Sequence, residues 1–164
     1  MNDIRVIKLE DENSIYINTI AKWMYDWWGS RDGYSLEAMN CFIKHSLCKD
    51  KLPHTYIALV DEQLVGMFQF SYADLVCRPD IYPWLCNVYV EQKYRQQGIF
   101  KVMMNQVFDC AQEAALKELF LYTKHIGLYE KYGWEFVGDI ETFTNDQHVQ
   151  RLYKLDINKQ FRIS

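Results

Sequence analysis

Glycine and proline are scarce in this chain, at seven and three of its 164 residues. The chain also has no internal repeat and no low-complexity tract. Scattered glycines and prolines end helices and strands, whereas a linker between domains needs them in clusters. A chain of this length commonly folds around one core. We therefore predict a single domain over residues 1–164.

Long apolar runs and paired cysteines are missing as well. No run reaches the roughly 18 apolar residues that a membrane span needs, and the first residues, MNDIRVIKLEDEN, contain no signal-peptide core. The five cysteines form no C-x-x-C pair, which argues against a disulfide framework and against a zinc site. These absences predict a cytoplasmic protein with reduced cysteines, no bound metal and no membrane partner.

Basic residues are outnumbered, because 18 Lys and Arg stand against 22 Asp and Glu, a net charge of −4. Nucleic acids are bound through a surplus of positive charge, so we expect no nucleic-acid partner. An acidic chain is compatible with a cationic substrate such as an amine. Aromatic residues are abundant, at 16% of the chain, and they suit both a core and the wall of a ligand cleft.

The spacing of apolar residues predicts an alternation of strands and helices. Strands are predicted at residues 3–9, 55–60, 64–73, 84–90, 119–123, 134–138 and 148–157. Helices are predicted from Asn13 or Ser14 to about Trp28, from Ser35 to Leu47, from Ile99 to Ala114 and at residues 126–133. The strand–helix–strand unit at 84–123 makes its two strands parallel, whereas short turns make their neighbours antiparallel. We therefore predict an α/β fold, of the mixed-sheet α+β kind, with helices on both faces of a central sheet.

The turn Arg95-Gln96-Gln97-Gly98 joins a buried strand to a helix that starts at once. The first N–H groups of a helix have no internal acceptor and carry partial positive charge, so this end can bind an anion. Gly98 permits a close approach of the backbone, and Arg95 and Lys101 add charge. Neither G-x-G-x-x-G nor a P-loop pattern is present. Taken alone, the turn is equally compatible with an ordinary entry into a surface helix.

A second stretch, LYEKYGWEFVG at residues 128–138, follows the turn by about thirty residues. With both stretches in this order, the chain resembles the GNAT superfamily of acyl-CoA-dependent N-acyltransferases. The family pattern Q/R-x-x-G-x-G/A reads Arg95-Gln96-Gln97-Gly98-Ile99-Phe100 here, with Phe100 in place of the usual Gly or Ala. The run D-L-x-x-R-P-D-x-x-P-W-L, which begins at Asp74, also resembles a bacterial subgroup of that family.

The resemblance implies an N-acetyltransferase with acetyl-CoA as its co-substrate. It places the pantetheine arm along the backbone of Val88, Tyr89 and Val90, with a backbone N–H near Val88 as donor to the developing oxyanion. It places the pyrophosphate on Arg95, Gln96, Gln97, Gly98, Ile99, Phe100 and Lys101. Tyr129 matches the position of the family's usual acid, which serves the leaving thiolate.

The general base is left open between Glu91, Asp74 and Asp80. Aromatic residues are candidates for the acceptor pocket, above all Trp28, Tyr34 and Trp84. The acceptor is expected to be a small-molecule or peptide amine, and the protein a monomer or homodimer. The alternative interpretation is a CoA-binding sensor or interaction domain without catalytic activity.

Overall fold

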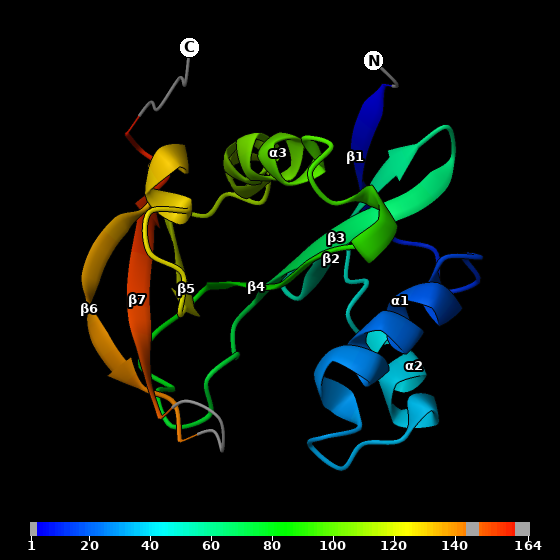
Figure 1. Cartoon of the computed structure of the whole chain (residues 1–164), viewed down its shortest axis with the longest axis horizontal. Helices are drawn as coiled ribbons and strands as arrows, with labels where there is room; N and C mark the ends of the chain where they lie inside the picture. The colour runs from blue at the N-terminus through cyan, green and yellow to red at the C-terminus, as the bar shows by residue number, and fades with distance from the viewer. Residues whose placement is uncertain (1–2, 144–147, 160–164) are drawn as a thin grey trace. The chain divides into compact units, whose positions relative to one another are not determined.

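The computed structural model describes residues 3–143 and 148–159 (Figure 1). These residues form two compact units. The first unit contains residues 3–70 and 87–103, and the second contains residues 71–86 and the described residues beyond 103. Strand β4 (Trp84–Val90) and helix α3 (Ile99–Glu113) contribute residues to both units. The single-domain organisation stays a prediction.

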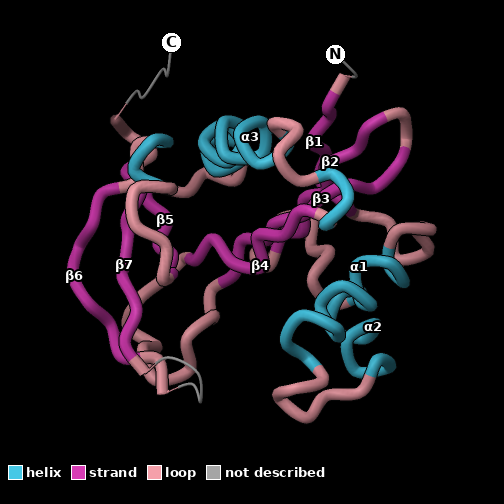
Figure 2. Tube along the Cα trace, in the orientation of Figure 1, coloured by secondary structure: helices cyan, strands magenta, loops and turns pink. Residues whose placement is uncertain are grey.

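Seven strands are hydrogen-bonded in the order β1-β2-β3-β4-β5-β7-β6 (Figure 2). Strands β1 to β3 are antiparallel, β4 and β5 are parallel, and β5, β7 and β6 are antiparallel. The mixed sheet, the parallel pair and the final hairpin of the sequence prediction are therefore confirmed. Besides β4, the strands are β1 (Ile4–Leu9), β2 (His54–Val60), β3 (Gln63–Ser71), β5 (Glu118–Thr123), β6 (Glu135–Glu141) and β7 (Val149–Asp156).

The first unit carries helices on both faces of its strands. Side chains alternate between faces along a strand, and Ile57, Leu59 and Met67 share one buried cluster with α1 (Ile17–Met24) and α2 (Leu36–Lys44). On the opposite face, a side chain at Gly66 would meet Met103 of α3 at 2.9 Å. The nearest atom to that position is Tyr89 O of β4, at 2.8 Å, so glycine allows the β4 backbone, as well as the flexible side chain of Met103, to lie close to position 66.

The first helix differs from the prediction at both of its ends, and α2 ends at Lys44, before the predicted Leu47. Helix α1 begins at Ile17 without a side-chain cap, because Ser14 Oγ accepts instead from the N–H of Tyr16, at 3.3 Å. The helix then continues as a π-helical turn, η1 (Tyr25–Gly29). Gly29 ends this turn as predicted, and a side chain there would meet Met39 Sδ of α2 at 2.9 Å. Helix α2 has its predicted cap, since Ser35 Oγ accepts from Ala38 N–H at 3.0 Å.

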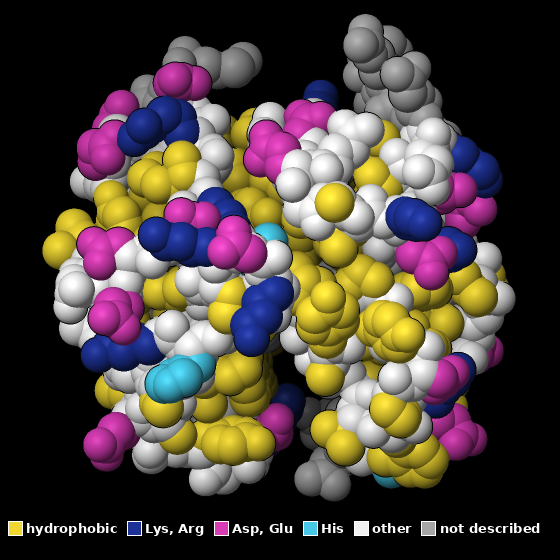
Figure 3. Space-filling model, turned by 180° about the vertical axis from the view of Figure 1, so that it is seen from behind, with side chains coloured by type: hydrophobic (Ala, Val, Ile, Leu, Met, Phe, Trp, Pro, Cys, Tyr) yellow, Lys and Arg dark blue, Asp and Glu magenta, His cyan; other side chains and the backbone are white. Residues whose placement is uncertain are grey.

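The second unit is built on β5, β7 and β6. Its core contains Leu75, Ile81, Trp84, Ile140 and Leu152. The helix predicted at 126–133 is a shorter 3₁₀ helix, η3 (Tyr129–Tyr132), and Gly133 ends it with a φ of 85°. The strand predicted at residues 64–73 also ends earlier than predicted, because β3 ends at Ser71. The surface carries interspersed charges of both signs on the face shown in Figure 3.

Buried His54 predicts a stability that depends on pH. The side chain is 5% exposed and its Nε2 has no hydrogen-bond partner, and this burial lowers the pKa of His54 below 6.5. The unfolded chain therefore binds a proton at His54 more tightly than the folded chain does. As a result, the free energy of unfolding is highest above pH 6.5 and decreases as the pH drops below that value. We expect His54→Gln to remove this loss, which can reach ~1.4 kcal/mol per pH unit.

Urea unfolding between about pH 7 and about pH 5 measures the effect as the difference between the wild type and the variant. His45→Gln, at an exposed position that follows α2, is the control. Parallel pH profiles for the wild type and His54→Gln would contradict the prediction.

Candidate functional site

The turn between β4 and α3 presents backbone N–H groups to the surface of the first unit. A 3₁₀ turn, η2 (Gln92–Tyr94), precedes it, and the first helical hydrogen bond runs from Val102 N–H to Gly98 O at 3.1 Å. The amides that precede Val102 in this first helical turn therefore have no helical acceptor. The helix dipole adds partial positive charge at the same place.

The backbone of this turn fits a phosphate group. Gln96 and Gly98 both have positive φ, at 62° and 82°, and left-handed residues in a turn gather successive N–H groups into an anion-binding concavity. Apart from Gly98 itself and its two chain neighbours, no atom of the described residues lies within 4 Å of the position that a Cβ on Gly98 would occupy. The turn is thus both open and furnished with donors, as an incoming pyrophosphate requires.

The polar side chains of the turn brace its backbone. Arg95 Nε donates to Val90 O at 2.9 Å, and its guanidinium lies 5.7 Å from the centre of the Tyr89 ring. Gln97 Nε2 donates to Lys93 O at 3.1 Å. Arg95 retains N–H groups beyond Nε, and Lys101 is exposed on α3. These contacts favour backbone amides as the principal anion ligands, with side chains holding them in place.

The first two helical residues divide their roles. Ile99 is buried and anchors the helix start to the core, whereas Phe100 is only half-buried. Phe100 occupies the position where the family pattern has Gly or Ala, and Gly98, two residues earlier, keeps the turn itself free of side chain.

The second half of β4 lies before this turn. Val88, Tyr89 and Val90 are half-buried. The Tyr89 ring contacts Trp23 and Trp27 of α1 and η1, with ring centres 5.0 and 5.6 Å apart. These contacts fix the side of the strand that carries Tyr89 against the helices of the first unit.

The three candidate bases have different surroundings. Burial raises the pKa of Asp74 to about 7, and the charge of this carboxylate, after burial itself, helps to raise the pKa of the Cys86 thiol. Asp80 is bound by Arg78 through two hydrogen bonds, of 2.8 and 2.7 Å, which lower the pKa of Asp80. Glu91 directly precedes η2, and its N–H donates to Val65 O at 2.9 Å. A carboxyl group with a pKa of about 7, as in Asp74, can exchange a proton near neutral pH.

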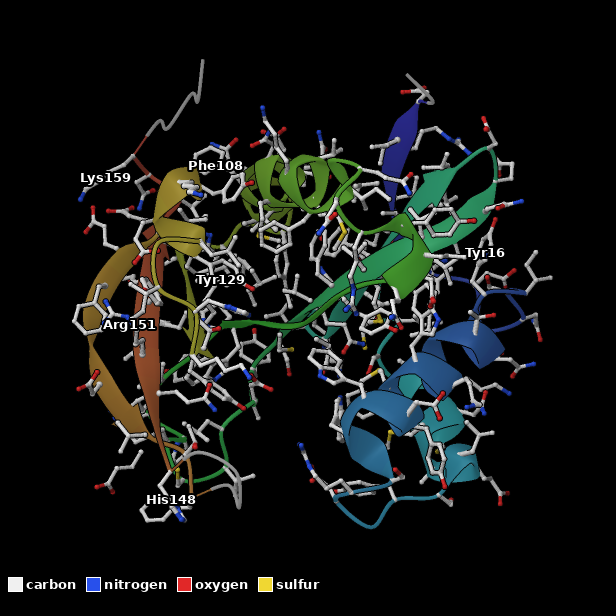
Figure 4. The ribbon with its side chains drawn as sticks, viewed as in Figure 1. Tyr16, Phe108, Tyr129, His148, Arg151 and Lys159 are labelled. Atoms are coloured by element: carbon white, nitrogen blue, oxygen red, sulfur yellow. The ribbon has the colours of Figure 1, made fainter. Side chains whose placement is uncertain are left out.

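Tyr129 opens the short helix η3 of the second unit (Figure 4). It is 8% exposed, and burial raises its pKa to about 12. Its ring lies 6.1 Å from Trp134 and 6.5 Å from Tyr153, measured between centres. The hydroxyl of Tyr153 donates to Glu130 Oε1 at 2.6 Å, which ties η3 to β7. Tyr129 therefore stays protonated through the physiological range, as a hydrogen-bond donor must.

The three aromatic residues predicted for the acceptor pocket separate into two groups. Trp28 and Tyr34 lie in the first unit as an edge-to-face pair 6.0 Å apart, and Tyr34 is 52% exposed. Trp84 belongs to the core of the second unit, at 1% exposure, between Phe120 and Tyr122. The prediction that Trp84 lines the acceptor pocket is therefore corrected: Trp84 is a core residue, because its side chain is buried.

Asn87 was not among the residues predicted from the sequence, although it lies in β4 next to Val88. It has a φ of 50°, and its Nδ2 donates to Gln69 Oε1 at 2.7 Å. The signal in the sequence is a polar amide inside an apolar strand, WLCNVYV, where Asn is disfavoured.

Among the described residues, no group of three or more His, Cys, Asp or Glu side chains could hold a metal ion. Within residues 3–143 and 148–159, every helix is too short or too polar to cross a membrane.

The mixed sheet with its helices defines the α/β class of the fold, and comparison with known proteins identifies the family. The model of the acetyltransferase (GNAT) family matches residues 17–134. The chain therefore belongs to this family. It is an acyltransferase whose co-substrate is acetyl-CoA, as the resemblance implied. No protein of curated function matches the chain in sequence.

Solved structures share the fold at low sequence identity. An aminoglycoside 6′-N-acetyltransferase complexed with coenzyme A has a TM-score of 0.73 at 12% identity, over 96% of this chain and 99% of that one. A GNAT acetyltransferase from Elizabethkingia anophelis with bound acetyl-CoA has a TM-score of 0.64 at 17% identity, over 95% and 99%. The acetyltransferase that modifies the N-terminal serine of ribosomal protein L7/L12 in Salmonella typhimurium has a TM-score of 0.69 at 11% identity, over 93% and 94%.

The open turn at Gly98 predicts a specific loss of CoA binding. We expect Gly98→Val to raise the Kd for CoA at least tenfold, because the new side chain would fill the space in front of the amides and strain a φ of 82°. Isothermal titration calorimetry with CoA measures this change.

Gly33→Val is the matched control, because Gly33 also has positive φ and open space at its Cβ position, in the loop before α2. It should lose comparable stability and bind CoA normally. Equal Kd values for the two variants would refute the placement of the phosphates.

Proposed function

We propose that the protein transfers the acetyl group of acetyl-CoA to a primary amine, by direct attack of the amine on the thioester. The observation that carries the proposal is the open turn Arg95–Gly98, with left-handed backbone at Gln96 and Gly98, at the start of α3. The family match supports it, because residues 17–134 include β4, this turn and Tyr129.

The turn anchors the co-substrate. Backbone N–H groups of residues 96–101 bind the pyrophosphate, while Arg95 and Lys101 add positive charge around it. Among the described residues, β4 pairs with β5 only at Trp84↔Phe120, so the peptide groups of Val88, Tyr89 and Val90 can pair with the amide groups of the pantetheine arm. Acetyl-CoA supplies the activated acetyl group, and the protein's own residues orient it and move protons.

Asp74 is the residue we assign to receive the proton of the amine. The reaction forms a C–N bond, breaks the C–S bond, and releases one proton from nitrogen. A carboxylate whose pKa lies at about 7 is deprotonated at slightly alkaline pH and still basic enough to take that proton, directly or through water. Asp80 is a weaker choice, because Arg78 already stabilises its charge. Glu91 remains the second candidate.

Tyr129 is assigned to the leaving thiolate. Burial raises the pKa of the Tyr129 phenol to about 12, whereas a thiol has a pKa of about 8.5. Full transfer of the phenol proton to the thiolate is therefore unfavourable. The hydroxyl therefore acts by donating a hydrogen bond to the sulfur as charge develops, and solvent completes the protonation.

The acceptor belongs to the class of primary amines, and the structural neighbours suggest which to try first. One neighbour is named as an aminoglycoside 6′-N-acetyltransferase and another as an enzyme that modifies an N-terminal serine. We therefore propose to measure the release of the CoA thiol from acetyl-CoA in the presence of three candidate acceptors: kanamycin, a peptide with an N-terminal serine, and spermidine. Turnover above hydrolysis with one of them supports the enzyme. Binding of acetyl-CoA without turnover in the whole panel would favour the CoA sensor instead.

Replacement of Tyr129 separates chemistry from binding. We expect Tyr129→Phe to lower kcat tenfold or more and to leave the Kd for acetyl-CoA within twofold, because only the hydroxyl is lost. Steady-state kinetics and calorimetry measure the two quantities. Tyr132→Phe, at the other end of the same short helix, is the control. Equal losses in kcat and affinity would show that Tyr129 is structural.

Replacement of Asp74 should change the pH profile. In the wild type, kcat/KM should rise as the pH increases through about 7, because the carboxylate must lose its proton to act as a base. We expect Asp74→Asn to abolish this inflection and to lower kcat/KM roughly a hundredfold at about pH 8. Asp80→Asn, in the same loop, should keep both. An unchanged profile in Asp74→Asn would exclude Asp74 as the base.

A further inference from the structure

A chain of hydrogen bonds crosses the first unit and ends at the irregular residue of β4. Asn87 Nδ2 donates to Gln69 Oε1 at 2.7 Å, and Gln69 Nε2 donates to Thr55 Oγ1 at 2.8 Å. Thr55 Oγ1 in turn donates to Ser46 O at 2.8 Å. The chain thus joins β4, β3, β2 and the segment that follows α2, all within one unit.

This polar chain lies in a part of the core that is otherwise apolar. Gln69 is 1% exposed and Thr55 is fully buried. Residues two apart on a strand share a face. Thr55 therefore lies on the same face of β2 as Ile57, and Gln69 lies on the same face of β3 as Met67. This is the face that packs against α1 and α2. Apolar residues could not replace the whole chain, because the main-chain carbonyl of Ser46 would lose the donor that Thr55 supplies. The chain therefore satisfies Ser46 O and fixes the side chains of Thr55, Gln69 and Asn87 at the same time.

The direction of every hydrogen bond in the chain follows from its end. The carbonyl of Ser46 can only accept, so the hydroxyl of Thr55 donates to it and must accept from Gln69. The amide nitrogen of Gln69 then faces Thr55, and its oxygen faces Asn87. Gln69 consequently presents one acceptor, in one place, to the side chain of Asn87.

Asn87 is the residue whose backbone departs from the strand. Its φ of 50° is left-handed, a conformation that Asn adopts more readily than other residues with a Cβ but that a strand interior does not favour. A left-handed residue inside a strand redirects the adjoining peptide groups and interrupts regular pairing. The peptide group that follows Asn87 carries the N–H of Val88.

We infer that Gln69 is a positioning residue for acetyl transfer: by holding the Asn87 side chain, it keeps Asn87 left-handed and so aims the backbone N–H of Val88 at the thioester carbonyl. This inference rests on the proposed function. Gln69 does not touch the substrate, and its effect passes through the backbone of β4. A buried acceptor fixed by two strands and a helix end is suited to this task, because a small displacement of an oxyanion donor is costly.

A double-mutant cycle tests the connection. Gln69→Met is similar in size but removes the acceptor, and it should lower kcat about tenfold while the Kd for acetyl-CoA stays within twofold. Asn87→Gly accepts positive φ without a side chain, whereas Asn87→Ala does not. Asn87→Ala should therefore lose more activity than Asn87→Gly. In the Asn87→Gly background, Gln69→Met should have little further effect, because its partner is already absent.

A second measurement reads the carbonyl directly and needs no acceptor. Acetyl-CoA labelled with carbon-13 at the thioester carbonyl should show a downfield shift when it binds the wild type, because a hydrogen bond polarises the carbonyl. The shift should shrink in Gln69→Met and in Asn87→Ala, and it should persist in the control Gln150→Met on β7. A purely structural role would lower the melting temperature and leave this shift unchanged.

The outcomes separate the inference from the proposed function. Wild-type kcat in Gln69→Met, an unchanged carbonyl shift in both variants, or additive losses in the cycle would each overturn the role of Gln69. If Gln69→Met does not fold, the comparison of Asn87→Ala with Asn87→Gly decides, and equal kcat and shift in these two would overturn it. If the wild type binds labelled acetyl-CoA but acetylates no amine, the proposed function fails while the carbonyl shift still tests the positioning.

Discussion

The left-handed backbone at Asn87, Gln96 and Gly98 is the constraint on which the candidate site depends. Regular strands and helices consume their peptide groups in internal pairing, so a site made of peptide groups needs points where the chain leaves that pairing. Strand β4 and helix α3 provide two rigid elements, and the left-handed residues within and between them redirect individual N–H groups. The polar side chains at this place bond back to the protein: Arg95 to Val90 O, Gln97 to Lys93 O and Asn87 to Gln69. Their shared role is to hold a backbone conformation.

Proton-handling groups follow the opposite rule. Asp74 and Tyr129 owe their shifted pKa values to burial, whereas the amides of the phosphate turn lie in an exposed segment. A diphosphate must reach its ligands from solution, but a base that works near neutral pH needs a carboxylate removed from water. Asp74 and Asp80 show the contrast within one loop. Burial raises the pKa of Asp74 to about 7, whereas the hydrogen bonds from Arg78 lower the pKa of Asp80.

Much of the fold could be predicted from the sequence, because strand and helix periods are local signals. All seven strands, the parallel β4–β5 pair and the Ser35 cap follow from local patterns. The π-helical turn at Tyr25–Gly29 and the 3₁₀ form of Tyr129–Tyr132 do not, because tertiary packing decides how tightly a helical segment winds. The assignment of Trp84 failed for a related reason. An aromatic residue at the start of a strand suits a ligand wall and a core equally well, and only the packing of Phe120 and Tyr122 against it decides.

The importance of Asn87 and Gln69 lay beyond sequence reasoning, because it arises from a contact between strands that are distant in the chain. A site made of peptide groups also bears on how far the sequence can vary within one fold. A site of peptide groups constrains φ and ψ more than it constrains side-chain identity, so a fold match at a TM-score of 0.73 is compatible with 12% identity. Such a site does require an interaction or a residue type that stabilises the backbone at each residue with positive φ. At Gly98 it is glycine itself. At Asn87 it is a buried chain of amide and hydroxyl groups anchored on the carbonyl of Ser46. The two solutions differ in cost: a glycine weakens the local chain, whereas the polar chain demands that every buried partner stay satisfied.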